Sequence, residues 1–274
     1  MMTGILILRR RALALATLFV GSLALAGCGS GVDPTYRRAV RSGGGGLAAA
    51  PPRTPKPSEA LDHSRNFAVH GIDVSKYQGR IDWEAVAASD VRFAWIKATE
   101  GADHLDARFH ENWAGAKAAG VPRGAYHFVY WCRPWRQEMA WFKQNVPVER
   151  DALPPVLDVE ATPESRTCKR RLTPDEVIPE MRAMLADMEA HYGKKPIVYS
   201  TVDFYEAILS GGGLEDYPIW VRSTKHHPSA RYGSRKWHFW QYQSDGSVPG
   251  IATAVDRNVF HGSANEWQKW LAMN

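Results

Sequence analysis

The sequence predicts an α/β fold, an irregular TIM-like barrel of eight strands with about five flanking helices. Over residues 67–274, short apolar runs alternate with segments of helical periodicity. Five strand–helix units follow one another, and this order implies a parallel sheet with right-handed crossovers. Beyond residue 209 the helical patterns fade and the remaining strands are joined by loops, so the barrel is expected to be irregular.

Each expected element has its own signals. Strands are expected at Val69–Ser75, Arg92–Thr99, Arg123–Tyr130, Pro155–Glu160, Pro196–Ser200, Tyr217–Arg222, Trp237–Gln243 and Ala254–Asn258. Helices are expected at Asp82–Ala88, Asp106–Ala119, Pro134–Asn145, Pro174–Tyr192 and Val202–Leu209, and a closing helix is expected at Ser263–Ala272. The fourth helix is the best marked, because Thr173 and Glu176 match a capping box and Gly193 can supply a left-handed C-cap.

The first residues have the pattern of a bacterial export signal. Arg9, Arg10 and Arg11 precede an apolar run at 12–26, which is too short to span a membrane comfortably. The run ends in Leu25-Ala26-Gly27-Cys28, which resembles a lipobox whose cysteine becomes lipidated. An ordinary signal peptide with a chance cysteine is the simpler alternative, but the small residues before Cys28 favour lipidation.

These features divide the chain into three parts. Residues 1–27 are predicted to be a lipoprotein signal peptide. Residues 28–66 begin with the lipidated Cys28 and continue as a flexible linker, because a Gly- and Pro-rich segment cannot bury enough apolar surface to fold. Residues 67–274 form the barrel domain. We therefore expect an exported protein, lipid-anchored to the cell envelope, at the periplasmic face of the outer membrane in a Gram-negative host.

The charge of the chain does not indicate a nucleic-acid partner. Residues 1–66 hold nine Lys or Arg and three Asp or Glu, whereas residues 67–274 hold 25 basic and 26 acidic residues. The folded part is therefore close to neutral, and the excess of positive charge belongs to the leader and linker. We expect no nucleic-acid partner, and contact with a membrane only through the lipid anchor.

The chain has three cysteines. If Cys28 carries the lipid, Cys132 and Cys168 remain, an even number in an oxidising compartment. We therefore predict that these two form a disulfide bond. The cysteines and histidines have no zinc-site spacing, and no phosphate-binding loop of the required spacing is present, so no metal or cofactor is expected.

Acidic residues stand at the predicted strand ends, where barrel enzymes place their active sites. Asp73 ends the first strand, Asp158 and Glu160 end the fourth, and Asp256 lies near the last. Because side chains alternate along a strand, Asp158 and Glu160 point together into the barrel, and Lys97 is also expected to point inward.

Two carboxylates on one strand face repel each other, and this repulsion raises at least one pKa. Glycoside hydrolysis needs such a pair, one acid to protonate the leaving oxygen and one carboxylate to stabilise the developing positive sugar. A lone D-x-E pair is more often structural. The cluster of charged residues inside one barrel favours a site, because such charges are costly unless they are solvated or paired.

The motifs of the chain resemble the glycoside hydrolase family 25 lysozymes. The resemblance runs from about residue 69 to 262 and consists of short motifs in the family's order. These motifs are Gly71-Ile72-Asp73-Val74-Ser75 with Tyr77-Gln78-Gly79, Ile96-Lys97-Ala98-Thr99-Glu100-Gly101, Gly124-Ala125-Tyr126-His127-Phe128, Leu157-Asp158-Val159-Glu160, Trp240-Gln241-Tyr242 and Val255-Asp256-Arg257-Asn258.

The resemblance implies cleavage of the β-1,4 bond between N-acetylmuramic acid and N-acetylglucosamine in peptidoglycan. It implies Glu160 as the general acid/base and Asp158 as the second carboxylate, acting as nucleophile or by orienting the acetamido group of the substrate. It further implies that Asp73 and Asp256 complete the acidic floor. The expected substrate-binding residues are Tyr126, Trp220, Trp240, Gln241 and Lys97.

The sequence also departs from the family. Trp220-Val221-Arg222-Ser223-Thr224 stands where many relatives carry a Trp, two small or apolar residues and then Tyr. Two alternatives therefore stay open: a hydrolase of another N-acetylated glucan such as chitin, and a lipoprotein that binds glycan without cutting it. The main prediction is a monomeric peptidoglycan hydrolase whose partner is the glycan strand.

Overall fold

The computed structural model describes residues 58–274. The predicted signal peptide, the lipidation site Cys28 and most of the predicted linker lie outside the described residues. Within the part that the structure describes, no helix combines the length and the apolar character needed to cross a membrane.

The folded domain begins earlier than the predicted boundary at residue 67. Residues Glu59–Ser64 form helix α1, and the side chain of Ser58 caps this helix by accepting from the backbone N–H of Leu61. Ala60 is fully buried, in the same apolar cluster as residues of the barrel wall. The linker prediction was wrong for residues 59–64, because this segment, although rich in charged residues, forms a short capped helix with one buried face.

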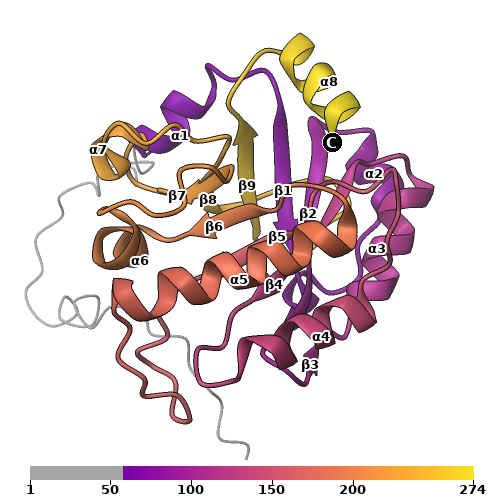
Figure 1. Ribbon diagram of the computed structural model, residues 1–274. Coiled ribbons are helices and arrows are strands. Elements are labelled where there is room, and N and C mark those ends of the chain that lie inside the picture. The colour runs from indigo at the N-terminus through magenta and orange to yellow at the C-terminus, as the bar shows by residue number, and fades with distance from the viewer. Residues whose placement is uncertain (1–57) are drawn as a thin grey trace, which may run out of the picture. The chain divides into compact units, whose positions relative to one another are not determined.

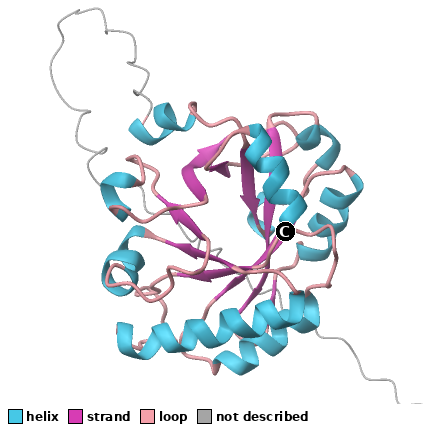
Figure 2. Ribbon diagram, turned by 45° about the horizontal axis from the view of Figure 1, so that its top comes forward, coloured by secondary structure: helices cyan, strands magenta, loops and turns pink. Residues whose placement is uncertain are grey.

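Eight strands form a closed barrel (Figures 1 and 2). They are β1 (His70–Val74), β2 (Val91–Glu100), β4 (Arg123–Phe128), β5 (Val156–Val159), β6 (Ile197–Ser200), β7 (Ile219–Arg222), β8 (Phe239–Gly246) and β9 (Val255–Phe260). The order around the barrel is β1-β9-β8-β7-β6-β5-β4-β2, and pairing of β1 with β2 closes it. A ninth strand, β3 (His104–Leu105), adds a short antiparallel edge to β2.

The barrel is of mixed type. The pairs from β1–β2 through β7–β8 are parallel, as the strand–helix units predict. Strand β9 runs antiparallel to both β8 and β1. The first residues of β9 therefore lie at the same end of the barrel as the last residues of the parallel strands, and this determines where Asp256 lies.

The helices surround the barrel (Figure 2). The described residues contain α1, α2 (Trp83–Ala87), α3 (Phe109–Ala118), α4 (Trp135–Asn145), α5 (Pro174–Tyr192), α6 (Val202–Phe204), α7 (Ser229–Tyr232) and α8 (Ala264–Met273). They also contain the 3-10 turn Lys76–Gln78 and the π-helical turn Tyr205–Leu209. The predicted number of about five helices was too low, because the short helices have no clear periodicity.

The ends of α5 differ in how well they match the sequence signals. Gly193 ends the helix in the left-handed conformation, with φ 65° and ψ 18°, as predicted. At the start, Thr173 is the N-cap residue, but its side chain makes no capping hydrogen bond. The predicted capping box is therefore absent, although Pro174 takes the first helical position.

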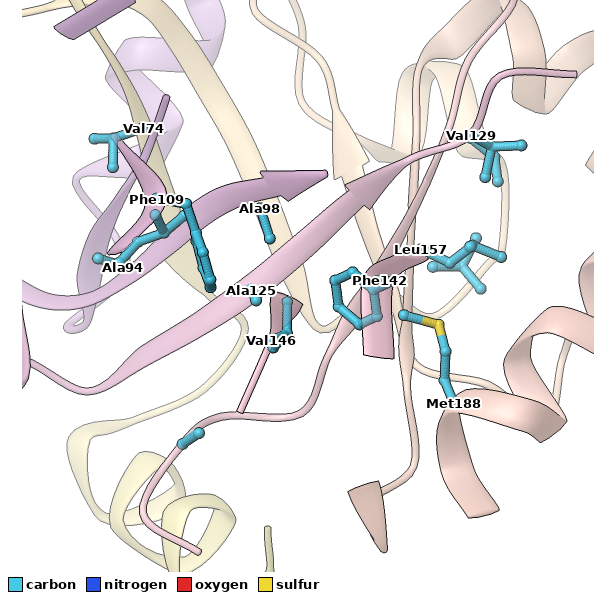
Figure 3. Packing of buried hydrophobic residues seen from close by; sticks show 14 of the residues in the cluster. Val74, Ala94, Ala98, Phe109, Ala125, Val129, Phe142, Val146, Leu157 and Met188 are labelled. Atoms are coloured by element: carbon cyan, nitrogen blue, oxygen red, sulfur yellow. The ribbon is translucent and has the colours of Figure 1, made fainter. Parts of the chain in front are cut away.

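Apolar side chains fill two layers. Figure 3 shows the outer layer between strands and helices, where Ala94, Ala98 and Leu157 pack against Phe109 and Phe142. The inner layer closes one end of the barrel with aromatic and aliphatic side chains from facing strands. Its members are Val69, Phe93, Trp95, Leu153, Val156, Ile197, Tyr199, Trp220, Phe239, Phe260, Trp267 and Trp270.

Gly124 makes room for this inner layer, because a Cβ atom at that position would overlap the ring of Trp95. The rings of Trp95 and Trp220 stack with centroids 5.8 Å apart. The packed layer leaves the opposite end of the barrel for polar side chains.

A disulfide bond joins Cys132 and Cys168, the pairing that the cysteine count predicts. It links the loop after β4 to the loop after β5, across 36 residues of chain.

We expect the Cys132→Ser/Cys168→Ser double variant to lose about 3–4 kcal/mol of free energy of unfolding, because without the cross-link the unfolded chain has more conformational freedom. Denaturant unfolding under non-reducing conditions measures this loss, and equal stability of variant and wild type would contradict it.

Candidate active site

A cavity of about 320 Å³ opens at the end of the barrel where the parallel strands finish. Its walls carry acidic, basic and aromatic side chains. They are Asp73, Ser75, Tyr77, Lys97, Tyr126, Phe128, Asp158, Glu160, Tyr199, Trp220, Arg222, Gln241 and Asp256. The cavity therefore lies where barrel enzymes place their chemistry.

The four acidic residues predicted from the sequence all line this cavity. Asp73 lies near the end of β1 and Asp158 in β5, and Glu160 follows β5 directly. Asp256 lies at the start of the antiparallel β9, where it pairs in register with Asp73. The strand alternation used in the prediction is correct, because Leu157 packs in the outer layer with the helices.

Asp158 and Glu160 differ in their contact with solvent. Asp158 is only 6% exposed, and its Oδ1 atom has no hydrogen-bond partner among the described residues. Glu160 is partly exposed. Its backbone carbonyl accepts a hydrogen bond of 2.8 Å from Nε1 of Trp131, which fixes the chain directly after β5. Glu160 is thus the member of the pair that is open to a ligand.

Burial raises the pKa of both carboxyl groups. The negative charge of Glu160 raises the pKa of Asp158 further, so this pKa lies well above its ordinary value. A hydrogen bond from Asp158 and the positive charges of Arg222 and Lys97 limit the rise in the pKa of Glu160. Burial thus favours a proton on this pair, and its titration belongs to both groups together.

Asp73 accepts two hydrogen bonds from neutral amides. Nε2 of Gln241 and Nδ2 of Asn258 donate to its Oδ2 atom, at 2.8 and 2.7 Å. The acceptor oxygens of these amides are used as well, since the hydroxyl of Tyr199 donates to Gln241 and the indole of Trp220 donates to Asn258. Burial raises the pKa of Asp73 to about 6, although the two amides favour its ionised form.

The remaining acid, Asp256, has a pKa raised to about 8 by burial and by the charge of Asp73. Tyr126 stands in the same cavity, and burial together with the nearby carboxylates raises its pKa well above the ordinary value. Asp256 can therefore carry a proton at neutral pH, and the hydroxyl of Tyr126 remains a hydrogen-bond donor.

Two cations face this acidic cluster. Nζ of Lys97, which the sequence placed inside the barrel, lies 2.7 Å from Oε2 of Glu100 and 4.9 Å from the ring centre of Phe128. Arg222 was not among the predicted site residues, although it departs from the family pattern and shares the inward parity of Trp220. Its positive charge lowers the pKa values of Asp73, Glu160 and Asp256.

We expect Arg222→Gln to shift the pH profile of activity to higher pH. Removal of the guanidinium raises the pKa of groups that must be ionised and of the group that must be protonated, so both limbs of the profile move the same way. The measurement is kcat/KM against pH. Arg166→Gln, an exposed arginine outside the cavity, is the matched control. An unshifted profile would show that the charge of Arg222 does not act on the reacting groups.

The structure corrects one of the two predicted tryptophans. Trp240 is fully buried and packs outside the barrel wall, where its Nε1 donates to the carbonyl of Ser223. It cannot stack on a ligand in the cavity. Trp220 does line the cavity, although it is only 2% exposed, packs in the inner apolar layer and donates to Asn258, and its contact with a substrate stays a prediction. The neighbouring prediction, Gln241, does line the cavity.

Sequence reasoning also missed cavity residues outside the acidic motifs. Tyr199 and Phe128 have the inward parity of their strands, which is a usable signal. Ser75 and Tyr77 follow β1, where strand alternation no longer applies. Among residues 58–274, no group of three or more His, Cys, Asp or Glu side chains is arranged to hold a metal ion.

The open barrel end, the carboxylate pair with raised pKa values and the surrounding hydrogen-bond donors are together the features of a barrel glycosidase. Comparison with known proteins identifies the group more closely. The sequence profile of Glycosyl hydrolases family 25 matches residues 72–251, and the chain belongs to this family.

Similar proteins agree with this assignment. The chain is 35% identical over 234 aligned residues to Lysozyme M1 of Streptomyces globisporus, covering 80% of this chain and 75% of that protein. The solved structure of a family 25 glycosyl hydrolase from Bacillus anthracis has a TM-score of 0.68 and 35% identity, covering 74% of this chain and 94% of the other. A bacterial lysozyme from Streptomyces coelicolor has a TM-score of 0.65 and 34% identity, covering 75% and 96%.

Proposed function

We propose that the protein is an N-acetylmuramidase that hydrolyses the β-1,4 bond between N-acetylmuramic acid and N-acetylglucosamine in peptidoglycan. The observation that carries the proposal is the Asp158–Glu160 pair, two carboxyl groups with raised pKa values at the wall of an open cavity. Family membership supports glycoside hydrolysis, and the similarity to lysozymes supports peptidoglycan as the substrate.

In the proposed reaction, Glu160 donates a proton to the leaving glycosidic oxygen. Burial raises the pKa of both carboxyl groups, so a proton is held by the pair to a higher pH than by free carboxyl groups. Glu160 can deliver it, since of the two side chains it is the more exposed to the cavity. As the proton leaves, the pair becomes more negative and stabilises the positive charge that develops on the sugar ring.

Asp158 has two possible roles as the glycosidic bond breaks. It either attacks the anomeric carbon as a nucleophile or orients the acetamido group of the substrate, which then attacks in its place. In both routes a water molecule next attacks the anomeric carbon, displaces the attacking group and gives its proton to the ionised Glu160, which completes the hydrolysis. The buried Oδ1 atom, which has no partner among the described residues, is suited to accept a hydrogen bond from an amide N–H. We favour the acetamido route for this reason. Turnover of de-N-acetylated peptidoglycan at the wild-type rate would exclude it.

The remaining cavity residues hold the substrate. Tyr126 can donate to a sugar hydroxyl, and Asp73 is kept in one orientation by Gln241 and Asn258. A binding protein that does not cut glycan has no need for buried carboxyl groups, whose desolvation is costly. This cost favours catalysis over the alternative of a purely glycan-binding lipoprotein.

Mass spectrometry of the fragments released from defined peptidoglycan tests the proposed bond. Muramidase activity gives fragments with muramic acid at the reducing end. Fragments with glucosamine at the reducing end would move the cleavage site to the other bond. Release of oligosaccharides from chitin at a comparable rate would favour the alternative of a more general N-acetylglucan hydrolase.

We further propose that the enzyme acts from the cell envelope as a monomer, anchored through Cys28. The lipobox-like sequence before this cysteine supports export and lipidation. The Cys28→Ser variant should move from the membrane fraction to the soluble fraction, and it should no longer incorporate labelled palmitate. Membrane association that survives the substitution would exclude a lipid on this residue.

A further inference from the structure

The catalytic cavity opens to solvent beside one exposed aromatic ring. Among the described residues, the large apolar side chains that are exposed are Tyr77, Val148 and Met273. Only Tyr77 lines the cavity, and its exposed fraction is 74%. A polymeric substrate continues beyond the rings that occupy the cavity, so its neighbouring sugars must pass over the rim. The position of Tyr77 is therefore relevant to binding.

The backbone that carries Tyr77 is held by its own side chains. Tyr77 is the middle residue of the 3-10 turn Lys76–Gln78, which follows β1. Oγ of Ser75 accepts from the N–H of Tyr77 at 3.3 Å, and Oε1 of Gln78 accepts from the N–H of Ser75 at 2.8 Å. These two bonds form a capping box, so the turn is defined locally.

Two further bonds tie the turn to the rest of the domain. Nε2 of Gln78 donates to the carbonyl of Ala254 at 3.1 Å, close to Asp256. The N–H of Lys76 donates to Oδ2 of the buried Asp106 at 3.0 Å. Gly79 then ends the turn with a φ of 67°, which favours glycine. The backbone of the turn is therefore held in place, while most of the ring is in solvent, with Nζ of Lys76 5.5 Å from the ring centre.

A solvent-exposed aromatic ring on a fixed backbone is suited to bind a flat apolar surface. A pyranose ring has such a surface on the side where its C–H groups gather, and aromatic side chains provide a large contact area with few rotatable bonds. Because the turn is already ordered, binding costs little further entropy. No packing in the described structure requires the ring to be aromatic, since most of its surface is in solvent.

We propose that Tyr77 is a sugar-stacking residue that forms a binding subsite for the glycan strand at the rim of the cavity in which the bond is cut. The inference rests on the proposed function, because it takes the substrate to be a long polysaccharide. The ring acts by contact area and not through its hydroxyl, so phenylalanine or tryptophan should serve equally well at this position.

The test compares Tyr77→Ala with the wild-type protein on soluble, uncross-linked peptidoglycan strands. We expect KM to rise about tenfold, the size of effect that loss of one aromatic contact produces, while kcat stays within about twofold. Tyr77→Phe and Tyr77→Trp should restore the wild-type KM. Met273→Ala, which removes an equally exposed apolar side chain on α8, is the matched control and should change neither constant.

A binding measurement separates this inference from the proposed function. The affinity for glycan strands is compared between the Glu160→Gln variant and the Glu160→Gln/Tyr77→Ala double variant. The measurement does not require either variant to cleave the glycan. Weaker binding of the double variant supports the subsite even if the assigned bond proves wrong. Equal affinity of the two variants would overturn the inference, and so would a loss confined to kcat. Failure of both Tyr77→Ala and Tyr77→Ser to fold would also overturn it, because the ring would then have a structural role.

Discussion

The Glu160→Gln variant is expected to lose at least about 10²-fold in kcat, because a general acid contributes this much or more to the rate. Glutamine has nearly the same shape as the protonated acid but cannot release a proton. Glu160 lies at the cavity wall and is the more exposed member of the carboxylate pair, so the substitution leaves the inner apolar layer intact. The measurement is the release of reducing ends from purified peptidoglycan, with kcat and KM determined separately.

Binding should survive this substitution, since the other polar residues of the cavity remain. Glu164→Gln is the matched control, because this exposed carboxylate lies four residues further along the chain and does not line the cavity. It should retain wild-type kcat. If the Glu160→Gln protein digests peptidoglycan at the wild-type rate, Glu160 is not the proton donor.

The Asp158→Asn variant should be at least about 10²-fold less active and yet no less stable. Burial and the charge of Glu160 raise the pKa of Asp158 well above its ordinary value, so the fold accommodates the neutral form of this side chain more readily than its charged form. Asparagine matches that acid in shape, and its amide can still donate a hydrogen bond to Glu160. It cannot become negative, so it can neither attack the sugar nor stabilise the positive charge in the transition state.

Thermal unfolding and kcat measured on the same preparation check both halves of this expectation. The melting temperature should stay equal to that of the wild-type protein or rise, since an amide is less costly to bury than a carboxyl group that can ionise. A large fall in melting temperature would assign Asp158 to structure. Retained activity would remove it from the reaction.

The core of this site could be predicted from the sequence because it depends on strand alternation. Asp158 and Glu160 share one parity on their strand, and Asp73 has the inward parity of the first strand. The alternation of inward and outward side chains involves only residues that are close in the chain, so it can be recognised in a single sequence. Asp256 was predicted from its motif, but its approach to Asp73 depends on the antiparallel direction of β9, which no local pattern encodes.

The same alternation explains the clearest error at the site. Trp240 and Gln241 are adjacent in β8, so they cannot both face the cavity. Both were carried over from one motif, and the buried Trp240 shows that a motif can contain residues that serve only packing. Arg222 was noticed as a departure from the family but was not assigned a direction, although it stands two residues after the inward Trp220.

Other features were beyond sequence reasoning because they depend on tertiary contacts. Helix α1 is too short for its periodicity to be recognised, and it is stabilised by packing of Ala60 against the barrel wall. The 3-10 turn that presents Tyr77 depends on bonds to the distant Ala254 and Asp106. Local propensity gives no information about such partners.

Because Asp73 and Asp256 are paired where the first and last strands close the barrel, we expect the stability of this closure to depend on pH. Strands β1 and β9 meet with these two carboxyl groups opposite each other, where two negative charges would repel. Their pKa values of about 6 and about 8 exceed the value of 3.8 for a free aspartate, so between roughly pH 4 and pH 8 the folded chain retains protons that the unfolded chain has released. The free energy of unfolding contributed by this seam therefore falls as the pH rises through that range. We therefore expect Asp73 and Asp256 to destabilise the joint between the first and last strands less in acid than at neutral pH.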